Sequence, residues 1–448
     1  MKLPPVGVTL STTMDTLKPR RIVLCLDGTW NNTYSRKHRS DGHTVLKPTN
    51  VLKLCRAVRP TSMADEREQL IYYDIGVGSL AEYPGLANRL LSLVDRVLGG
   101  LLGAGFETNI EDALNFLVLN HREGDAVFIF GFSRGAATAR ALTRFLDWAQ
   151  GLPTKRDSYY LPQLFRAYIK SRGLRDRDEV LAEINRERAR ERRPLPPLDP
   201  FQKIEVEYLG VWDTVMALGS RLRAIGAGTS ITSKSFHVDR QPARCVRHAR
   251  QALAIDEVRY DFRPEIWTGH APGQVMEQRW FAGVHSNIGG GYVDDGLANL
   301  AFHWILDGAK DDGLDVDKGF AGIFRGFPQD RLYRSESLIY RIFDGLRWQF
   351  GRGRRRLVDN PAAANLTLSP SVIHRLRANP FGLNKDGEIR FPELRRQAYR
   401  PENLLRFLAS QPNLDKYLES LGLDKEHRQL PADVLQRIEE LRPWHARA

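Results

Sequence analysis

The stretch Gly-Phe-Ser-Arg-Gly at residues 131–135 constrains the fold most, because apolar residues precede it and an alanine-rich segment follows it. The apolar residues 126–130 predict a buried strand, and the sequence from 136 onward predicts a helix. Ser133 therefore stands at a strand-to-helix corner. A serine between two glycines at such a corner is typical of a nucleophile elbow, since the glycines let strand and helix approach closely.

Further strand and helix signals surround this corner. Ile110, Ala113, Leu114 and Leu117 recur with helical spacing and predict one buried helix face just before the strand that carries Ser133. The other predicted strands cover residues 22–26, 70–79, 204–215, 250–257 and 278–292. Strands that alternate with helices predict an α/β fold with a mostly parallel sheet and helices on both faces. After about residue 300 the sequence is mostly helical in character.

Three parts of unequal character are expected along the 448 residues. Residues 1–20 form a tail, and residues 21–310 form the α/β core. Within this core, residues 170–200 are charged and then proline-rich, which predicts a surface insertion with one solvated helix. Residues 311–448 are expected to form a helical cap or a membrane-docking region.

Composition narrows the class of protein. No run of about 18 apolar residues occurs, so a membrane-spanning helix is not expected. The N-terminus lacks the apolar segment of a signal peptide, so we expect a cytoplasmic protein as synthesised. Cys25, Cys55 and Cys245 are too few and too scattered for a disulfide framework or a zinc site. The net charge of +12 suits an anionic partner such as nucleic acid or a phospholipid surface, or simply a basic soluble surface.

A serine hydroxyl needs a histidine as base, and that histidine needs a carboxylate to orient it. Asp213 ends the apolar stretch Tyr-Leu-Gly-Val-Trp-Asp, and His285 ends Arg-Trp-Phe-Ala-Gly-Val-His. Both lie where a predicted strand meets a loop, which is the edge at which ligands bind in open α/β sheets. The chain order serine, acid, histidine is that of the α/β-hydrolase arrangement. We therefore predict an α/β-hydrolase-like core with Ser133 as nucleophile, Asp213 as acid and His285 as base.

Other acids and histidines compete for these roles. Asp256, Asp294 and Asp295 are alternative acids, and Asp213 is preferred because its strand is the longer apolar run. Asp256 has a simpler interpretation as a capping or salt-bridging residue beside nearby arginines.

The competing histidines are assigned by their surroundings. His38, His43, His237 and His248 lie in polar stretches and are expected at the surface. His303 is expected to pack in a helix.

Acyl transfer also requires donors aimed at the developing oxyanion. The backbone N–H of Arg134, directly after the nucleophile, is one candidate. The turn after the first strand, Asp-Gly-Thr, offers the backbone N–H groups of Gly28 and Thr29 as others. The Asp27 carboxylate in this turn could equally tie down its own loop.

Two rival functions find no support in the motifs. Phosphatases with an aspartate nucleophile carry two aspartates around such a turn, and here Cys25 occupies the place of the first. A dinucleotide site would need Gly-x-Gly-x-x-Gly after a strand, and this spacing is absent.

Five colinear motifs carry a resemblance to a known family. They are LCLDGTWNN, FGFSRGAATAR, GVWDTV, QALAIDEVRYDFRPEIW and WFAGVHSNIGGGYVDDGLANLAFHWI, spread over about residues 20–310. Together they resemble the Tle1-type phospholipase effector domain of type VI secretion systems, an α/β-hydrolase. The resemblance implies Ser133, Asp213 and His285 as the triad. Where the family often has aspartate after His-Ser, this chain has Asn287, which leaves the triad intact and alters the loop near the base.

The resemblance also implies a phospholipid substrate, delivery by a type VI secretion system, and a secretion apparatus or immunity protein as partner. A lipid substrate calls for an apolar, basic-edged docking surface. Residues 336–356 offer a helical apolar stripe followed by aromatic and cationic anchors. The stripe is Leu338, Ile339, Ile342, Phe343 and Leu346, and the anchors are Trp348, Phe350, Arg352, Arg354, Arg355 and Arg356. The alternative is a stripe packed on the core with a solvated arginine loop behind it.

We therefore expect a serine ester hydrolase, a phospholipase A that releases fatty acid from glycerophospholipids. No metal or organic cofactor is required, and no nucleic-acid partner is expected because no recognised binding fold surrounds the arginines. A soluble carboxylesterase with the same triad remains an alternative. A non-catalytic module on the same fold that binds lipid or a partner is the alternative from another class.

Overall fold

The computed structural model describes residues 18–28, 36–38, 44–76, 106–171, 173–190, 197–198, 201–215, 240–259, 262–333, 355, 357, 365–378 and 398–445. The strands are β1 (Arg21–Leu26), β2 (Arg36–His38), β3 (Thr44–Leu46), β4 (Gln69–Asp74), β5 (Ala126–Phe132), β6 (Val206–Trp212), β7 (Val246–Ala254), β8 (Val275–Phe281) and β9 (Leu366–Leu368). The helices are α1 (Asn50–Ala57), α3 (Phe106–Asn120), α4 (Arg134–Ala149), the 3-10 helix η1 (Lys155–Tyr160), α5 (Leu161–Ser171), α6 (Arg177–Arg190), α8 (His285–Gly289), α9 (Gly296–Asp311), α10 (Lys318–Gly322), α12 (Pro370–Arg377), α13 (Glu402–Ala409), α14 (Leu414–Ser420) and α15 (Ala432–His445).

A seven-stranded sheet forms the centre of the protein, in the order β4-β1-β5-β6-β7-β8-β9. Every neighbouring pair in it is parallel. The chain leaves β1 toward β4 on one side and later returns to β5 on the other, so the strand order reverses between β1 and β5. Ligands bind at such a switch point, outside the carboxyl ends of the strands. The α/β fold with a mostly parallel sheet is as predicted.

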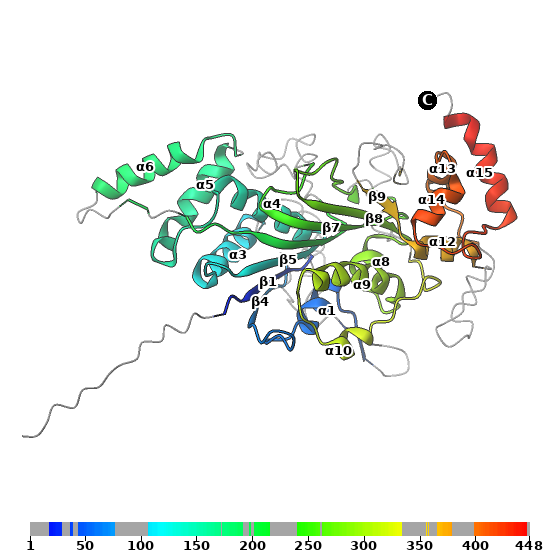
Figure 1. Ribbon diagram of the computed structural model, residues 1–448, viewed down its shortest axis with the longest axis horizontal. Helices are drawn as coiled ribbons and strands as arrows, with labels where there is room; N and C mark the ends of the chain where they lie inside the picture. The colour runs from blue at the N-terminus through cyan, green and yellow to red at the C-terminus, as the bar shows by residue number, and fades with distance from the viewer. Residues whose placement is uncertain are drawn as a thin grey trace, which may run out of the picture.

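Helices cover both faces of this sheet, as Figure 1 shows. Strand β1 illustrates why, because all six of its residues are buried and alternate between the two faces. Ile22, Leu24 and Leu26 join the cluster formed with α3 and α4. Val23 and Cys25 join the cluster formed with α1 and α9. A strand buried on both faces needs a continuous apolar run, which is the pattern that the sequence showed.

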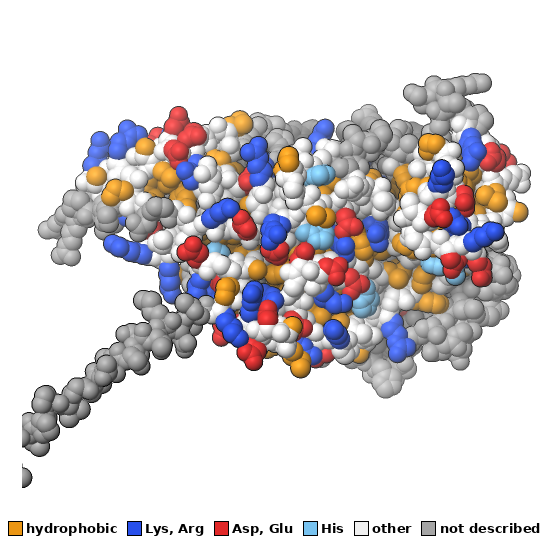
Figure 2. Space-filling model, viewed as in Figure 1, with side chains coloured by type: hydrophobic (Ala, Val, Ile, Leu, Met, Phe, Trp, Pro, Cys, Tyr) orange, Lys and Arg blue, Asp and Glu red, His pale blue; other side chains and the backbone are white. Residues whose placement is uncertain are grey.

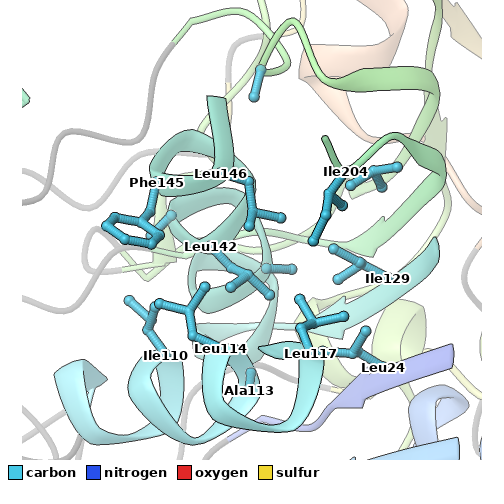
Figure 3. Packing of buried hydrophobic residues seen from close by; sticks show 14 of the residues in the cluster. Leu24, Ile110, Ala113, Leu114, Leu117, Ile129, Leu142, Phe145, Leu146 and Ile204 are labelled. Carbon is cyan, nitrogen blue, oxygen red and sulfur yellow. The ribbon is translucent and has the colours of Figure 1, made fainter. Parts of the chain in front are cut away.

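The helix before the elbow strand packs as its spacing predicted. Ile110, Ala113, Leu114 and Leu117 of α3 are fully buried, and they face Leu142 and its neighbours on α4 (Figure 3). The packing of α3 on α4 therefore stabilises the corner between β5 and α4.

The C-terminal helices pack against the far end of the sheet. Helices α12 to α15 share an apolar cluster with Leu253, Ile255, Trp280 and Ala282 from β7, β8 and the residues after them. In Figure 1 these helices lie together beyond β8 and β9. Strand β9 was not predicted, since three residues give no periodic signal. Within the described residues, no helix is both long and apolar enough to cross a membrane.

Three local expectations need refinement. Strand β8 ends at Phe281, so the expected strand over 278–292 contains the loop and helix that carry His285. Strand β4 ends at Asp74 rather than Ser79, whose position lies outside the described residues. Helix α6 forms in the charged insertion, but it buries Val180 and Ile184 on one face and is not solvated all round.

His248 is not the surface residue that its polar stretch suggested. It lies in β7, which begins four residues earlier than expected, and its side chain is 12% exposed. Its Nδ1 lies 2.7 Å from Asp312 Oδ2, and its Nε2 lies 3.3 Å from Glu277 Oε2. Burial lowers the pKa of His248, but the hydrogen bonds to Asp312 and Glu277 outweigh it and raise the pKa to about 9.

We expect this histidine to make stability depend on pH. Its folded pKa of about 9 exceeds the ordinary value of 6.5, so its stabilisation is complete below about pH 6.5 and is lost as pH rises through about 9. The free energy of unfolding of wild type and His248→Gln should therefore converge over that range. His427→Gln, at a half-exposed histidine, serves as control. A wild-type advantage that stays constant from below pH 6.5 to above pH 9 would contradict the assignment.

Candidate active site

Ser133 occupies the corner between β5 and α4 in a backbone conformation that few non-glycine residues adopt. Its φ is 57° and its ψ is −119°. Such a conformation costs about 1–3 kcal/mol for a residue with a Cβ and is held only by the surrounding structure. The Ser133 N–H donates to the carbonyl of Trp212 (3.1 Å), and its carbonyl accepts from Ala137 and Val215. The elbow is thereby bonded to the end of β6.

The two glycines beside Ser133 permit the close packing that the motif predicted. A Cβ at Gly131 would lie 2.5 Å from the carbonyl oxygen of Gly135. A Cβ at Gly135 would lie 2.1 Å from the Leu26 carbonyl oxygen and 2.5 Å from that of Asp27. The first turn of α4 therefore rests directly on the backbone at the end of β1.

Replacement of Gly135 by alanine should be strongly destabilising. In an open helix this change gains about 1 kcal/mol from helix propensity, but here the new Cβ meets backbone, which cannot move aside. We expect a loss of more than about 2 kcal/mol in the free energy of unfolding, measured by denaturant titration. Gly322→Ala in α10, where nothing lies within 4 Å of the new Cβ, is the matched control. Equal stability of the two variants would contradict the tight packing.

Asp213 and His285 meet at the same edge of the sheet. Asp213 directly follows β6 and is fully buried, and His285 begins α8 after the turn that follows β8. His285 Nδ1 lies 2.7 Å from Asp213 Oδ2. A carboxylate bonded to Nδ1 orients the ring so that Nε2 points away from that carboxylate. Nε2 is the nitrogen that a base would use.

Aromatic rings and charged groups surround the imidazole. The rings of Phe132 and Phe262 lie 4.7 Å and 4.9 Å from it, between centroids. Phe132 directly precedes Ser133, so the elbow and the histidine share a packing contact. Glu257 Oε2 accepts the backbone N–H of His285 (3.2 Å). Burial lowers the pKa of His285, opposed by the hydrogen bond and charge of Asp213, so the imidazole is neutral at neutral pH.

Arg355 makes a two-pronged contact with the same carboxylate. Its Nη1 lies 2.6 Å from Asp213 Oδ1, and its Nη2 lies 3.0 Å from Oδ2. Burial raises the pKa of Asp213, but the Arg355 charge and the His285 contact outweigh it and bring the pKa to about 2. Asp213 is therefore an anion bonded to the side chains of His285 and Arg355.

This contact corrects the expectation for Arg355 as a membrane anchor. The residue is 7% exposed and bound to a fully buried carboxylate, so it does not face a lipid surface. Its role at Asp213 was not predicted, because nothing in Arg-Gly-Arg-Arg-Arg distinguishes one arginine from the others. The other proposed anchors, Trp348, Phe350, Arg352, Arg354 and Arg356, lie outside the described residues, as does the stripe from Leu338 to Leu346.

The competing acids have other partners. Asp256 Oδ2 accepts from the Gly283 N–H (2.7 Å) and the Tyr399 hydroxyl (2.8 Å), so this carboxylate braces the loop before His285. Asp294 accepts from the Tyr333 hydroxyl (2.7 Å), and Asp295 pairs with the buried Lys53 (2.9 Å). His303 lies in α9 as expected.

The expected oxyanion donors differ in their availability. The Gly28 N–H donates to Asp27 Oδ1 (2.7 Å), so in this structure it is engaged in its own turn and is not the open donor that we expected. The other Asp27 oxygen accepts from Thr49 (2.5 Å) and Tyr73 (2.8 Å), which confirms that this carboxylate ties down its loop. Thr29 lies outside the described residues. Arg134 begins α4, where backbone N–H groups and the helix dipole favour negative charge.

Asn287 braces the loop that carries His285. Its Oδ1 accepts from the N–H groups of Val284 (3.3 Å) and Tyr333 (3.2 Å), and its Nδ2 donates to the Arg331 carbonyl (3.2 Å). An aspartate could accept the same two bonds but could not donate the third. The asparagine thus ties the histidine loop to the segment near residue 331.

Among the described residues, no cluster of three or more histidine, cysteine, aspartate or glutamate side chains could hold a metal ion. All three cysteines are free thiols.

Solved structures and a curated protein are similar to this chain at low sequence identity. A solved structure of an uncharacterized protein from Pseudomonas aeruginosa is 15% identical with a TM-score of 0.40, covering 96% of this chain and 62% of that one. A structure of the Tle1 effector bound to the VgrG spike of the type 6 secretion system is 16% identical with a TM-score of 0.37, covering 77% of this chain and 84% of that one. The uncharacterized protein YEL023C of Saccharomyces cerevisiae is 25% identical over 258 residues, 56% of this chain and 33% of that protein. The chain thus spans about a third of this curated relative.

The family itself is shown by a longer match. Residues 20–308, well over half of the chain, match the family described as type VI secretion system (T6SS), phospholipase effector Tle1-like, catalytic domain. The chain therefore belongs to the Tle1-like phospholipase effector family.

Proposed function

We propose that this protein is a serine ester hydrolase of the phospholipase A type, which releases fatty acid from glycerophospholipids. The observation that carries the proposal is the buried contact of 2.7 Å between His285 Nδ1 and Asp213 Oδ2, at the sheet edge where Ser133 occupies a strained elbow. Family membership supports the substrate class.

In the proposed reaction, Ser133 Oγ attacks the acyl carbonyl while His285 Nε2 takes its proton. Asp213 holds the imidazole in the tautomer that leaves Nε2 unprotonated, and it stabilises the imidazolium that forms. The neutral resting state of His285, favoured by burial, suits a general base. His285 then protonates the departing alcohol oxygen, and the lysophospholipid leaves.

Water then completes the cycle. His285 deprotonates a water molecule, which attacks the acyl-enzyme and releases the fatty acid with regeneration of Ser133. The backbone N–H of Arg134 would stabilise the negative oxygen in both steps, because it belongs to the positive end of α4. A second donor would come from the turn at residues 28 and 29 once the Gly28 N–H is released from Asp27.

The remaining parts of the proposal concern access to lipid and delivery. The net charge of +12 favours an anionic interface, although Figure 2 shows basic and acidic side chains interspersed on the face in view. We propose that residues 336–354 and Arg356 supply the peripheral membrane contact. Because the family description names a type VI secretion effector, we propose delivery by such a system. We propose the secretion apparatus or an immunity protein as partner.

A comparison of two substrates tests the proposed function. Purified protein is incubated with vesicles of anionic glycerophospholipid and, separately, with a short soluble ester, and products are identified by mass spectrometry. Fatty acid and lysophospholipid from the vesicles, absent with Ser133→Ala, support the phospholipase. Turnover of the soluble ester alone would instead support the carboxylesterase, and turnover of neither substrate would support a non-catalytic binding module.

A further inference from the structure

The Asp213 carboxylate is shared by two cationic or potentially cationic partners, and only one of them belongs to the proposed triad. His285 contacts Oδ2, whereas Arg355 contacts both oxygens in a fork. The Ala254 N–H also donates to Oδ1 (3.0 Å). Both carboxylate oxygens are therefore fixed in direction, and a planar guanidinium is the group best suited to do this.

Arg355 is itself anchored by backbone groups around the site. Its Nη1 donates to the Ala254 carbonyl (2.9 Å), and its Nη2 donates to the carbonyl of Phe262, whose ring packs on His285. The Asn403 side chain donates to the carbonyls of Arg355 (2.9 Å) and Ile255 (3.0 Å). Asn403 belongs to α13, so a C-terminal helix holds the arginine against the end of β7.

The sequence position of Arg355 makes this arrangement informative. The family match ends at residue 308, so the arginine lies in the segment that follows the matched catalytic domain. Leu357, two residues later, is buried in the C-terminal apolar cluster. Packing of the C-terminal region thus fixes the arginine beside the acid of the proposed triad.

The charges around His285 show what the arginine contributes. Among the described residues, the charges of Asp213, Glu257 and Arg259 act on the imidazole. Glu257 and Arg259 form a two-pronged pair (both contacts 2.8 Å) and largely cancel each other. The negative charge of Asp213 is balanced by the positive charge of Arg355. Removal of the Arg355 charge would leave one net negative charge beside the imidazole.

The Arg355 fork also stabilises Asp213 in a strained backbone conformation. Asp213 has a φ of 41°, a left-handed conformation that a residue with a Cβ seldom adopts. Its carboxylate must be held from more than one side to keep that conformation and still meet Nδ1. The Arg355 fork and the Ala254 N–H supply those contacts.

We propose that Arg355 is a positioning residue, which fixes the Asp213 carboxylate for His285 and limits its negative field at the imidazole. The inference rests on the proposed function, since it assigns Asp213 and His285 to a triad. It differs from a merely structural salt bridge because it requires the basicity of His285 to depend on the charge at position 355.

Two substitutions separate the charge from the fork. Arg355→Gln removes the positive charge. The negative field of Asp213 is then no longer opposed, so the pKa of His285 should rise. The acid limb of the kcat/KM profile for a short soluble ester should then move up by about one pH unit. In Arg355→Lys the charge is kept, so the limb should stay near its wild-type position. Both variants lose the fork, and we expect kcat to fall about 10- to 100-fold with little change in KM.

A second measurement makes the test independent of turnover. NMR titration of isotopically labelled histidine, with His285 assigned from the spectrum of His285→Gln, reports the imidazole directly in the full-length protein. The midpoint should move up by about one unit in Arg355→Gln and stay near wild type in Arg355→Lys. Arg406→Gln, which removes an exposed arginine of α13 paired with Glu402, is the control and should change neither readout.

The outcomes distinguish this inference from the proposed function. An unchanged or lowered midpoint in Arg355→Gln, with ester turnover intact in wild type, would overturn the role of Arg355 alone. A raised midpoint without any ester turnover in wild type would support the electrostatic role and overturn the hydrolase. Should the glutamine variant fail to fold, wild-type kcat in Arg355→Lys would overturn the need for the fork.

Discussion

Ser133→Ala is expected to lower kcat for ester hydrolysis on the order of 10⁵-fold, because the variant has no nucleophile to form the acyl-enzyme. Residual turnover would come from substrate binding and oxyanion stabilisation. Fatty-acid release from glycerophospholipid vesicles, followed over time, measures the effect. The change removes one hydroxyl from a partly exposed residue, so the fold should persist.

A third residue at the same position checks that the loss is chemical. Ser133→Gly should be as inactive as Ser133→Ala but more stable, because glycine adopts a φ of 57° without the strain that a Cβ imposes. The expected difference between the two is about 1 kcal/mol in favour of glycine, after the extra entropy of glycine in the unfolded chain is counted. Ser410→Ala, on the C-terminal helices, should retain full activity. Hydrolysis by Ser133→Gly at the wild-type rate would contradict the role of Ser133.

Asp213→Asn is expected to lower kcat about 10⁴-fold and to destabilise the protein as well. The amide no longer holds His285 in the tautomer that exposes a basic Nε2. It also leaves the buried Arg355 guanidinium without a countercharge, which costs about 3–5 kcal/mol. Kinetics with a short soluble ester and denaturant unfolding measure the two effects separately.

A double variant separates these two consequences. Asp213→Asn combined with Arg355→Met removes both buried charges, so part of the lost stability should return while activity stays low. Stability that falls further in the double variant would show that the two side chains are not coupled. Wild-type activity in Asp213→Asn would exclude Asp213 as the acid.

The sequence predicted the sheet and the elbow because both rest on local patterns. Apolar runs such as residues 22–26 and 126–130 match strands buried on both faces. Gly131 is required by backbone contacts within one turn of Ser133, whereas Gly135 is required by the backbone at the end of β1. The proximity of Asp213 and His285 was predictable because the carboxyl ends of parallel strands lie at one edge of the sheet.

The features that could not be predicted depend on contacts between distant segments. Arg355 meets Asp213 across 142 residues of sequence, and its flanking arginines give no sign of which one is buried. His248 looked like a surface residue because the partners that bury it, Asp312 and Glu277, come from a later helix end and a later strand. The Gly28 N–H is a local exception, since it donates to the neighbouring Asp27, and the sequence had left open whether this carboxylate ties down its own loop.

Labelling with a fluorophosphonate probe tests the central claim most directly, because such probes react covalently with a serine that a neighbouring base has activated. The full-length protein, Ser133→Ala and the control Ser410→Ala are treated in parallel, and the modified peptide is located by mass spectrometry. We expect one adduct on Ser133 in wild type and in Ser410→Ala, and none in Ser133→Ala. An adduct on another residue, or equal labelling of Ser133→Ala, would contradict the account.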